Sequence, residues 1–176
     1  MSQSATLYRL SNNSFEEFKR TVDTQKVDLK KLSRSYETFQ GTFMGIEFVL
    51  SKNQISETRE LILEIFTPKQ FIEDRDLENI DETEDFEGFS EDILYLNPDK
   101  VIAINNIISM ISEENFAANF DPIELNTNYI YPSVWNKNNS LNSVFTLTHI
   151  LEDFRNLKLF FSNASKDRDY VIAFVG

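Results

Sequence analysis

The stretch NTNYIYPSVW, residues Asn126–Trp135, gathers the aromatic side chains around which the rest of the chain is expected to pack. It holds the only tryptophan of the chain and two of its six tyrosines. Pro132 disfavours helix at the residue before it, so we expect an extended segment with Tyr129 and Tyr131 on one face. The Tyr131–Pro132 bond is a candidate for the cis isomer, because cis costs an X–Pro bond only about 0.5–1 kcal/mol.

These rings have two possible roles. Amphipathic rings with polar tips are common at interfaces and in pockets, so Tyr129, Tyr131 and Trp135 are candidate binding residues. The alternative is that they only anchor a long loop to the core, through ring burial and hydrogen bonds of their polar groups. In either case we expect Trp135 to be largely buried.

A helix predicted over residues 40–51 is the expected partner of this stretch. Its apolar residues recur at helical spacing, and a short strand over residues 46–50 is the alternative. Gly41 and Gly45 lie four apart and so face one side. Each glycine costs a helix about 1 kcal/mol relative to alanine, which indicates a close contact there. We expect Tyr129–Trp135 to lie between this helix and the long C-terminal helix.

Both ends of the chain are predicted to be strands. Ala5–Leu10 alternates along its length, and Tyr170–Val175 is apolar enough to be buried on both faces. We expect the two to be neighbours in one sheet. A further strand is predicted over residues 93–96, and helices over residues 14–23, 28–36, 40–51, 57–66, 98–111, 112–120 and 142–164. The predicted fold class is therefore α+β, with several helices packed on a small sheet that includes both terminal strands. Residues 1–176 are expected to form a single domain.

Side chains that cap helices mark several of these boundaries. Asn97 followed by Pro98 is a strong helix start, because the asparagine can cap and proline suits the first helical position. Asp28 and Ser112 are further N-cap candidates. Asp121 and Pro122 are expected to close the helix that begins after Ser112.

The acidity of the chain is concentrated in residues 73–92. This segment holds 11 acidic residues and one arginine, while the rest of the chain holds 18 acids and 16 bases, within a total net charge of −12. We expect a surface excursion that the fold does not need. Its acidic residues, with Asp81, Glu82, Glu84 and Asp85 at the centre, are a candidate docking segment for a basic protein.

Other classes of partner find less support in the sequence. The chain lacks the excess of basic residues that phosphate contacts require, so nucleic-acid binding is disfavoured. Asp74, Asp76 and Glu78 alternate as in a calcium loop, but Asn79 stands where such a loop needs glycine. With no cysteine and a single histidine, His149, we predict neither a metal site nor a cofactor, and we expect His149 to be a surface or half-buried residue.

The N-terminus shows neither a charged start nor an apolar run of signal length, and no window approaches 18 apolar residues. We therefore expect a soluble cytoplasmic protein that does not enter membranes. The sequence leaves the oligomeric state open.

At four places the chain resembles the YfbM-like family of bacterial proteins, whose function is unknown. They are ATLYRLSNNSFEEF, GTFMGIEFVLS, ILYLNPDKV, and the C-terminal third with IYPSVW, a long helix and YVIAFVG. Together they cover most of the chain outside the acidic segment. In GTFMGIEFVLS, Phe43 and Glu47 stand where the family usually has tryptophan and histidine. The resemblance implies a compact α+β domain and brings no activity with it.

Two hypotheses about function follow. The first is a non-catalytic binding or interaction protein, for example an inhibitor or immunity protein for a basic partner, in which the acidic segment speeds encounter. The alternative is a small enzyme that uses carboxylate and tyrosine side chains in a pocket near Glu47, Tyr129 and Tyr131. The sequence contains no nucleophile elbow and no phosphate-binding glycine loop, so whether the protein is an enzyme stays open.

Overall fold

The computed structural model of this chain describes residues 3–20, 28–72, 93–137 and 144–176. Within them a sheet has the strand order β2-β1-β5-β4-β3, and all neighbours are antiparallel. The strands are β1 (Ser4–Leu10), β2 (Ser35–Gln40), β3 (Gln70–Ile72), β4 (Ile93–Leu96) and β5 (Tyr170–Val175). The terminal strands pair directly, with Ala5 opposite Val175 and Leu10 opposite Tyr170. This confirms the expected pairing and the α+β class.

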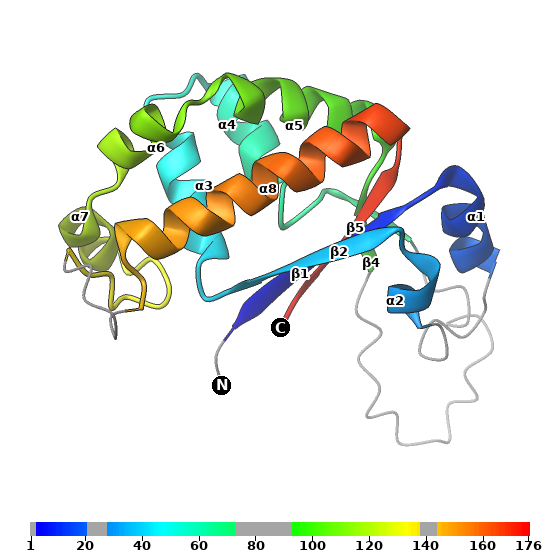
Figure 1. Cartoon of the computed structure of the whole chain (residues 1–176), viewed down its shortest axis with the longest axis horizontal. Coiled ribbons are helices and arrows are strands. Elements are labelled where there is room, and N and C mark those ends of the chain that lie inside the picture. The colour runs from blue at the N-terminus through cyan, green and yellow to red at the C-terminus, as the bar shows by residue number, and fades with distance from the viewer. Residues whose placement is uncertain (1–2, 21–27, 73–92, 138–143) are drawn as a thin grey trace, which may run out of the picture.

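The helices are α1 (Asn12–Arg20), α2 (Leu29–Leu32), α3 (Phe43–Ser51), α4 (Ser56–Leu63), α5 (Pro98–Met110), α6 (Glu113–Asn119), α7 (Pro122–Thr127) and α8 (Leu147–Asp167). Helices α3 to α8 gather on one side of the sheet, and α1 and α2 lie by its other end (Figure 1). Within the described residues, none of these helices combines the length and apolar character needed to cross a membrane.

The central strand β5 contributes to two hydrophobic cores. Val171 and Ala173 belong to the large core that the sheet shares with the helices of the α3–α8 side. Ile172, between them, points to the opposite face and joins a smaller core with Phe15 and Phe18 of α1. This alternation explains why the strand is apolar at consecutive positions, and it confirms the predicted burial of both faces.

Side-chain caps begin several helices. The Asn97 Oδ1 atom accepts a hydrogen bond of 2.9 Å from the Lys100 N–H, and Pro98 opens α5, as predicted. Ser112 caps α6 in the same way. Asp121 was predicted to close that helix but instead begins α7, where its side chain accepts from the Ile123 N–H. An aspartate followed by proline is itself a helix start, because the carboxylate can cap and proline suits the first helical position.

Several predicted helices have different bounds in the structure, and the physical reason is clear for three of them. Residues 33–36 do not continue the helix after Asp28, because Tyr36 lies in edge strand β2 opposite Tyr8. Gln40 also belongs to β2, so α3 begins only at Phe43. The long helix α8 begins at Leu147, where the Thr146 hydroxyl accepts from the backbone N–H of the first turn. Strand pairing and side-chain capping decide where these helices begin and end. The periodicity of apolar residues carries no information about pairing or capping.

Candidate functional site

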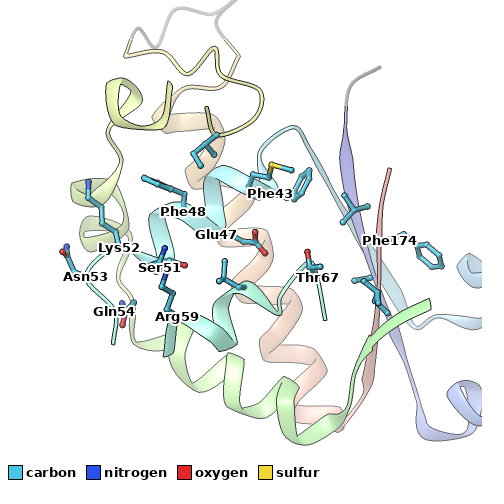
Figure 2. Close-up of a pocket in the computed structure, with 16 residues that line it drawn as sticks. Phe43, Glu47, Phe48, Ser51, Lys52, Asn53, Gln54, Arg59, Thr67 and Phe174 are labelled. Atoms are coloured by element: carbon cyan, nitrogen blue, oxygen red, sulfur yellow. The ribbon is translucent and has the colours of Figure 1, made fainter. Parts of the chain in front are cut away.

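A pocket of about 960 Å³ opens between α3, α4 and the sheet (Figure 2). One wall comes from α3, a second from strands β4 and β5, and Ile130 contributes from the loop after α7. The pocket is lined by Phe43, Met44, Glu47, Phe48, Ser51, Lys52, Asn53, Gln54, Arg59, Leu63, Thr67, Leu94, Ile130, Ala173, Phe174 and Val175. Apolar residues make up just over half of this lining, and most of the polar ones gather at one end.

The periodicity of α3 explains which of its side chains reach the pocket. Ile46, Val49 and Leu50 face the core and are almost completely buried. Glu47 and Ser51 lie one helical turn apart on another face, which is turned to the pocket. The helix is therefore apolar toward the core and carries its two polar groups toward the cavity.

Glu47 is the most unusual group in the pocket. Its side chain extends into the cavity toward Thr67 (Figure 2), and its Oε1 atom is shielded from solvent with no hydrogen-bond partner. Burial raises the pKa of Glu47 from its ordinary value of 4.5 to about 8, although a hydrogen bond from the Phe66 backbone lowers it in part. The carboxyl group is therefore mostly protonated at neutral pH and able to donate a hydrogen bond.

The polar groups of the pocket gather where α3 ends and α4 begins. The Ser51 Oγ atom is shielded and has no hydrogen-bond partner. Lys52 is ion-paired to Glu124 and also donates to the Asn119 carbonyl at 3.3 Å. Arg59 makes no ion pair with any described residue, and its side chain extends toward the Ser51 end of α3 (Figure 2).

The predicted site residues do not converge on this pocket. Glu47 lines it, but Tyr129, Tyr131 and Trp135 do not. The predicted extended segment is wrong: residues 128–132 form turns, and Tyr129 adopts φ 55° with 86% of its surface exposed. Its ring therefore does not share a face with that of Tyr131, whose hydroxyl accepts a hydrogen bond of 2.9 Å from the Gln3 N–H.

Trp135 anchors the loop as expected. It is 4% exposed, and its indole N–H donates to the Ile130 carbonyl at 2.9 Å. Two further hydrogen bonds of 2.9 Å join Trp135 to Asn126, so the two ends of the stretch are held together. The cis isomer of the Tyr131–Pro132 bond is present. The anchoring role, which was the alternative, thus describes Trp135 and Tyr131.

The expected contact with glycine is closest at Gly45, whereas a Cβ at Gly41 would lie 3.6 Å from the Tyr131 ring. A Cβ atom at Gly45 would overlap the Trp135 ring and would lie 3.2 Å from Ile150 of α8, so the ring fills the space between α3 and α8. Gly41 lies before α3 at φ +71°, and a Cβ there would come within 2.7 Å of Phe145. The predicted pair of glycines on one helix face is therefore wrong, because Gly41 serves the turn after β2.

The acidic docking segment, including Asp81, Glu82, Glu84 and Asp85, and the calcium-like pattern lie outside the described residues. Within the part that the structure describes, no group of three or more acidic or histidine side chains could hold a metal ion.

The sequence did not predict the contact between Thr42 and Asp153 or the polar end of the pocket. The buried Thr42 hydroxyl donates to Asp153 of α8, and burial is the main cause that raises the pKa of Asp153. His149, one turn earlier, is half-buried as predicted, and its Nδ1 atom accepts from the Phe145 N–H at 3.2 Å. The polar end of the pocket, with Ser51 and Arg59, was also missed. Its signal was the four-residue spacing of Glu47 and Ser51.

A family model described as a domain of unknown function, DUF1877, matches residues 1–174. The chain belongs to this family. The finding agrees with the resemblance to YfbM-like proteins, and DUF1877 as described carries no assigned function.

A solved structure has the same fold over its whole length. It is the crystal structure of a protein of unknown function, YfbM, from Escherichia coli, with a TM-score of 0.62, 12% identity and 100% of each chain covered. At this identity the likeness concerns the DUF1877 fold alone. No curated protein matches the chain significantly.

Proposed function

We propose that this DUF1877 protein is a non-catalytic binding protein whose pocket takes a small, largely apolar molecule with a hydrogen-bonding group opposite Glu47. The observation that carries the proposal is the shielded, unpartnered Oε1 atom of Glu47 inside an apolar cavity of about 960 Å³. Cavities of about 300–1,000 Å³ with a few polar groups are typical of small-molecule sites.

The energetics of Glu47 favour a ligand. A buried polar group without a partner costs about 1–3 kcal/mol. The raised pKa keeps the carboxyl neutral, which avoids burying a charge but leaves a hydrogen bond unmade. A carbonyl, ether or hydroxyl oxygen on a ligand would complete it once a rotation of the carboxyl turns this group to the cavity. Apolar parts of the same ligand would cover Phe43, Phe48 and Leu63.

A small enzyme is the second candidate, because a carboxyl held neutral near pH 7 can act as a general acid. The pocket supports binding better. Glu47 is the one carboxyl among its described lining residues, and Lys52 is occupied by Glu124, so no second group is placed to act as a base. Docking of a basic protein on residues 73–92 stays a prediction from the sequence.

The test is a fluorescence titration with the neutral apolar dye N-phenyl-1-naphthylamine. Leu63→Trp places a large ring in the pocket lining and should weaken dye binding at least about tenfold, since the cavity is then occupied. Leu159→Trp is the matched control, because Leu159 is also an exposed leucine but lies on α8 and does not line the pocket. It should bind like the unaltered protein. Absence of binding, or equal weakening by both substitutions, would rule the proposal out.

A further inference from the structure

The two ends of the pocket differ in polarity. Residues 51–54 and Arg59, at the junction of α3 and α4, supply its cations, amides and a hydroxyl. The sheet side supplies the apolar side chains of Leu94, Ala173 and Val175. A ligand that satisfies both ends must itself be polar at one end and apolar at the other.

The sign of the polar end is positive. Its charged side chains are Lys52 and Arg59, and the Lys52 charge is already balanced by Glu124. Arg59 has no acidic partner among the described residues. A guanidinium group that no described carboxylate pairs with is available to an anion from outside.

Ser51 gives the second observation. Its Oγ atom is shielded from solvent and lacks a hydrogen-bond partner, and it lies one turn, about 6 Å along α3, from Glu47. A rotation about χ1 would turn this hydroxyl to the cavity, where it could donate to an oxygen that also contacts Arg59. A ligand oxygen bound at Ser51 and Arg59 is therefore a different group from the one that faces Glu47, one helical turn away.

We propose that the ligand of this pocket is an amphipathic anion, with its acidic group held at the Ser51–Arg59 end and its apolar body lying toward Ala173 and Val175. The inference rests on the proposed function, because it names the class of molecule that the pocket takes. A carboxylate, sulfate or phosphate headgroup would supply the same contacts. The test below distinguishes these three headgroups.

The test compares octanoate, 1-octanol and octylammonium as competitors that displace N-phenyl-1-naphthylamine at neutral pH. These probes share an apolar chain and differ in the charge of the headgroup. The order of their affinities therefore reports on the headgroup's contacts with the polar end of the pocket. Octanoate should displace the dye at about five- to tenfold lower concentration than octanol, and octylammonium should be the weakest. The preference for octanoate should shrink as salt is added.

Arg59→Gln should bring octanoate to the level of octanol and leave octanol unchanged. Arg20→Gln, which removes the same charge at the end of α1 and away from the pocket, is the matched control and should change neither probe. Octyl sulfate and octyl phosphate, tested in the same way, distinguish the headgroups.

The outcomes separate the two proposals. If the dye binds in the pocket but octanoate and octanol compete equally, the anion is wrong and the binding pocket stands. A preference for octanoate that Arg59→Gln does not reduce would also overturn the assignment of the headgroup to this end. If no probe enters the pocket, both proposals fail.

Discussion

At the scale of single residues, Glu47 should make the stability of the fold depend on pH. Its pKa is about 8 in the folded protein against an ordinary value of 4.5. Between these values the folded state binds the proton and the unfolded chain does not, so the free energy of unfolding falls as pH rises. The contribution is complete below about pH 4.5 and lost by about pH 8, and it amounts to a few kcal/mol.

Glu47→Gln should remove this dependence. Urea unfolding of the two proteins at several pH values between about 5 and 8 measures it, because the other carboxyl groups are common to both. The free energies should diverge as pH rises, with the variant becoming the more stable relative to the unaltered protein. Parallel pH profiles would show that Glu47 ionises normally and that its burial has been misjudged.

The contact of Gly45 with Trp135 is a second test at this scale. Alanine is the better helix former by about 1 kcal/mol, yet its Cβ would overlap the indole ring. Gly45→Ala should therefore destabilise the protein by about 1–3 kcal/mol, as overpacking does. Gly176→Ala is the control, because nothing lies within 4 Å of a Cβ there. Thermal unfolding that shows Gly45→Ala neutral or stabilised would contradict this packing.

At the scale of secondary structure elements, an ion pair fixes the corner between α8 and β5. The side chain of Arg9 on β1 donates to Asp169 from Nε at 3.0 Å and from Nη2 at 2.9 Å, and both residues are buried. The same guanidinium reaches Asp167 at 2.7 Å. This pair ties the first strand to the turn that leads into the last.

Asp169→Ala should cost about 3 kcal/mol or more, because it leaves the buried Arg9 charge with a half-exposed partner only. Asp99→Ala is the matched control. Asp99 is 87% exposed in its pair with Arg168, so its loss should stay within about 0.5 kcal/mol. Equal effects in chemical denaturation would mean that the corner does not depend on the buried pair.

The elements also show what sequence reasoning can reach. Caps such as Asn97-Pro98 and the apolar run of β5 are local signals, so they were predicted correctly. The start of α3 was not, because Gln40 is held in β2 by pairing with Ser4, which is distant in sequence. Glu47 was singled out from the resemblance, whereas Arg59 became a site residue only once α4 was placed beside α3.

At the scale of the whole molecule, the acidic segment 73–92 remains a prediction from the sequence. Replacing it by a short glycine–serine linker should leave the melting temperature within a few degrees, since loop length has little effect on closure entropy. Binding to a basic protein such as lysozyme, measured at low salt, should weaken in the same variant. A linker variant that fails to fold would place Phe86 and Phe89 in the core.

The central claim is that ligands enter the Glu47 pocket rather than the exposed aromatic loop. The most direct measurement is a set of ¹H–¹⁵N correlation spectra recorded while N-phenyl-1-naphthylamine is added. The account predicts saturable shift changes centred on the amides of Phe48, Leu63 and Phe174, which line the pocket. Changes centred instead on Tyr129 and Val134, the exposed apolar residues of the loop, with the pocket amides unmoved, would contradict it.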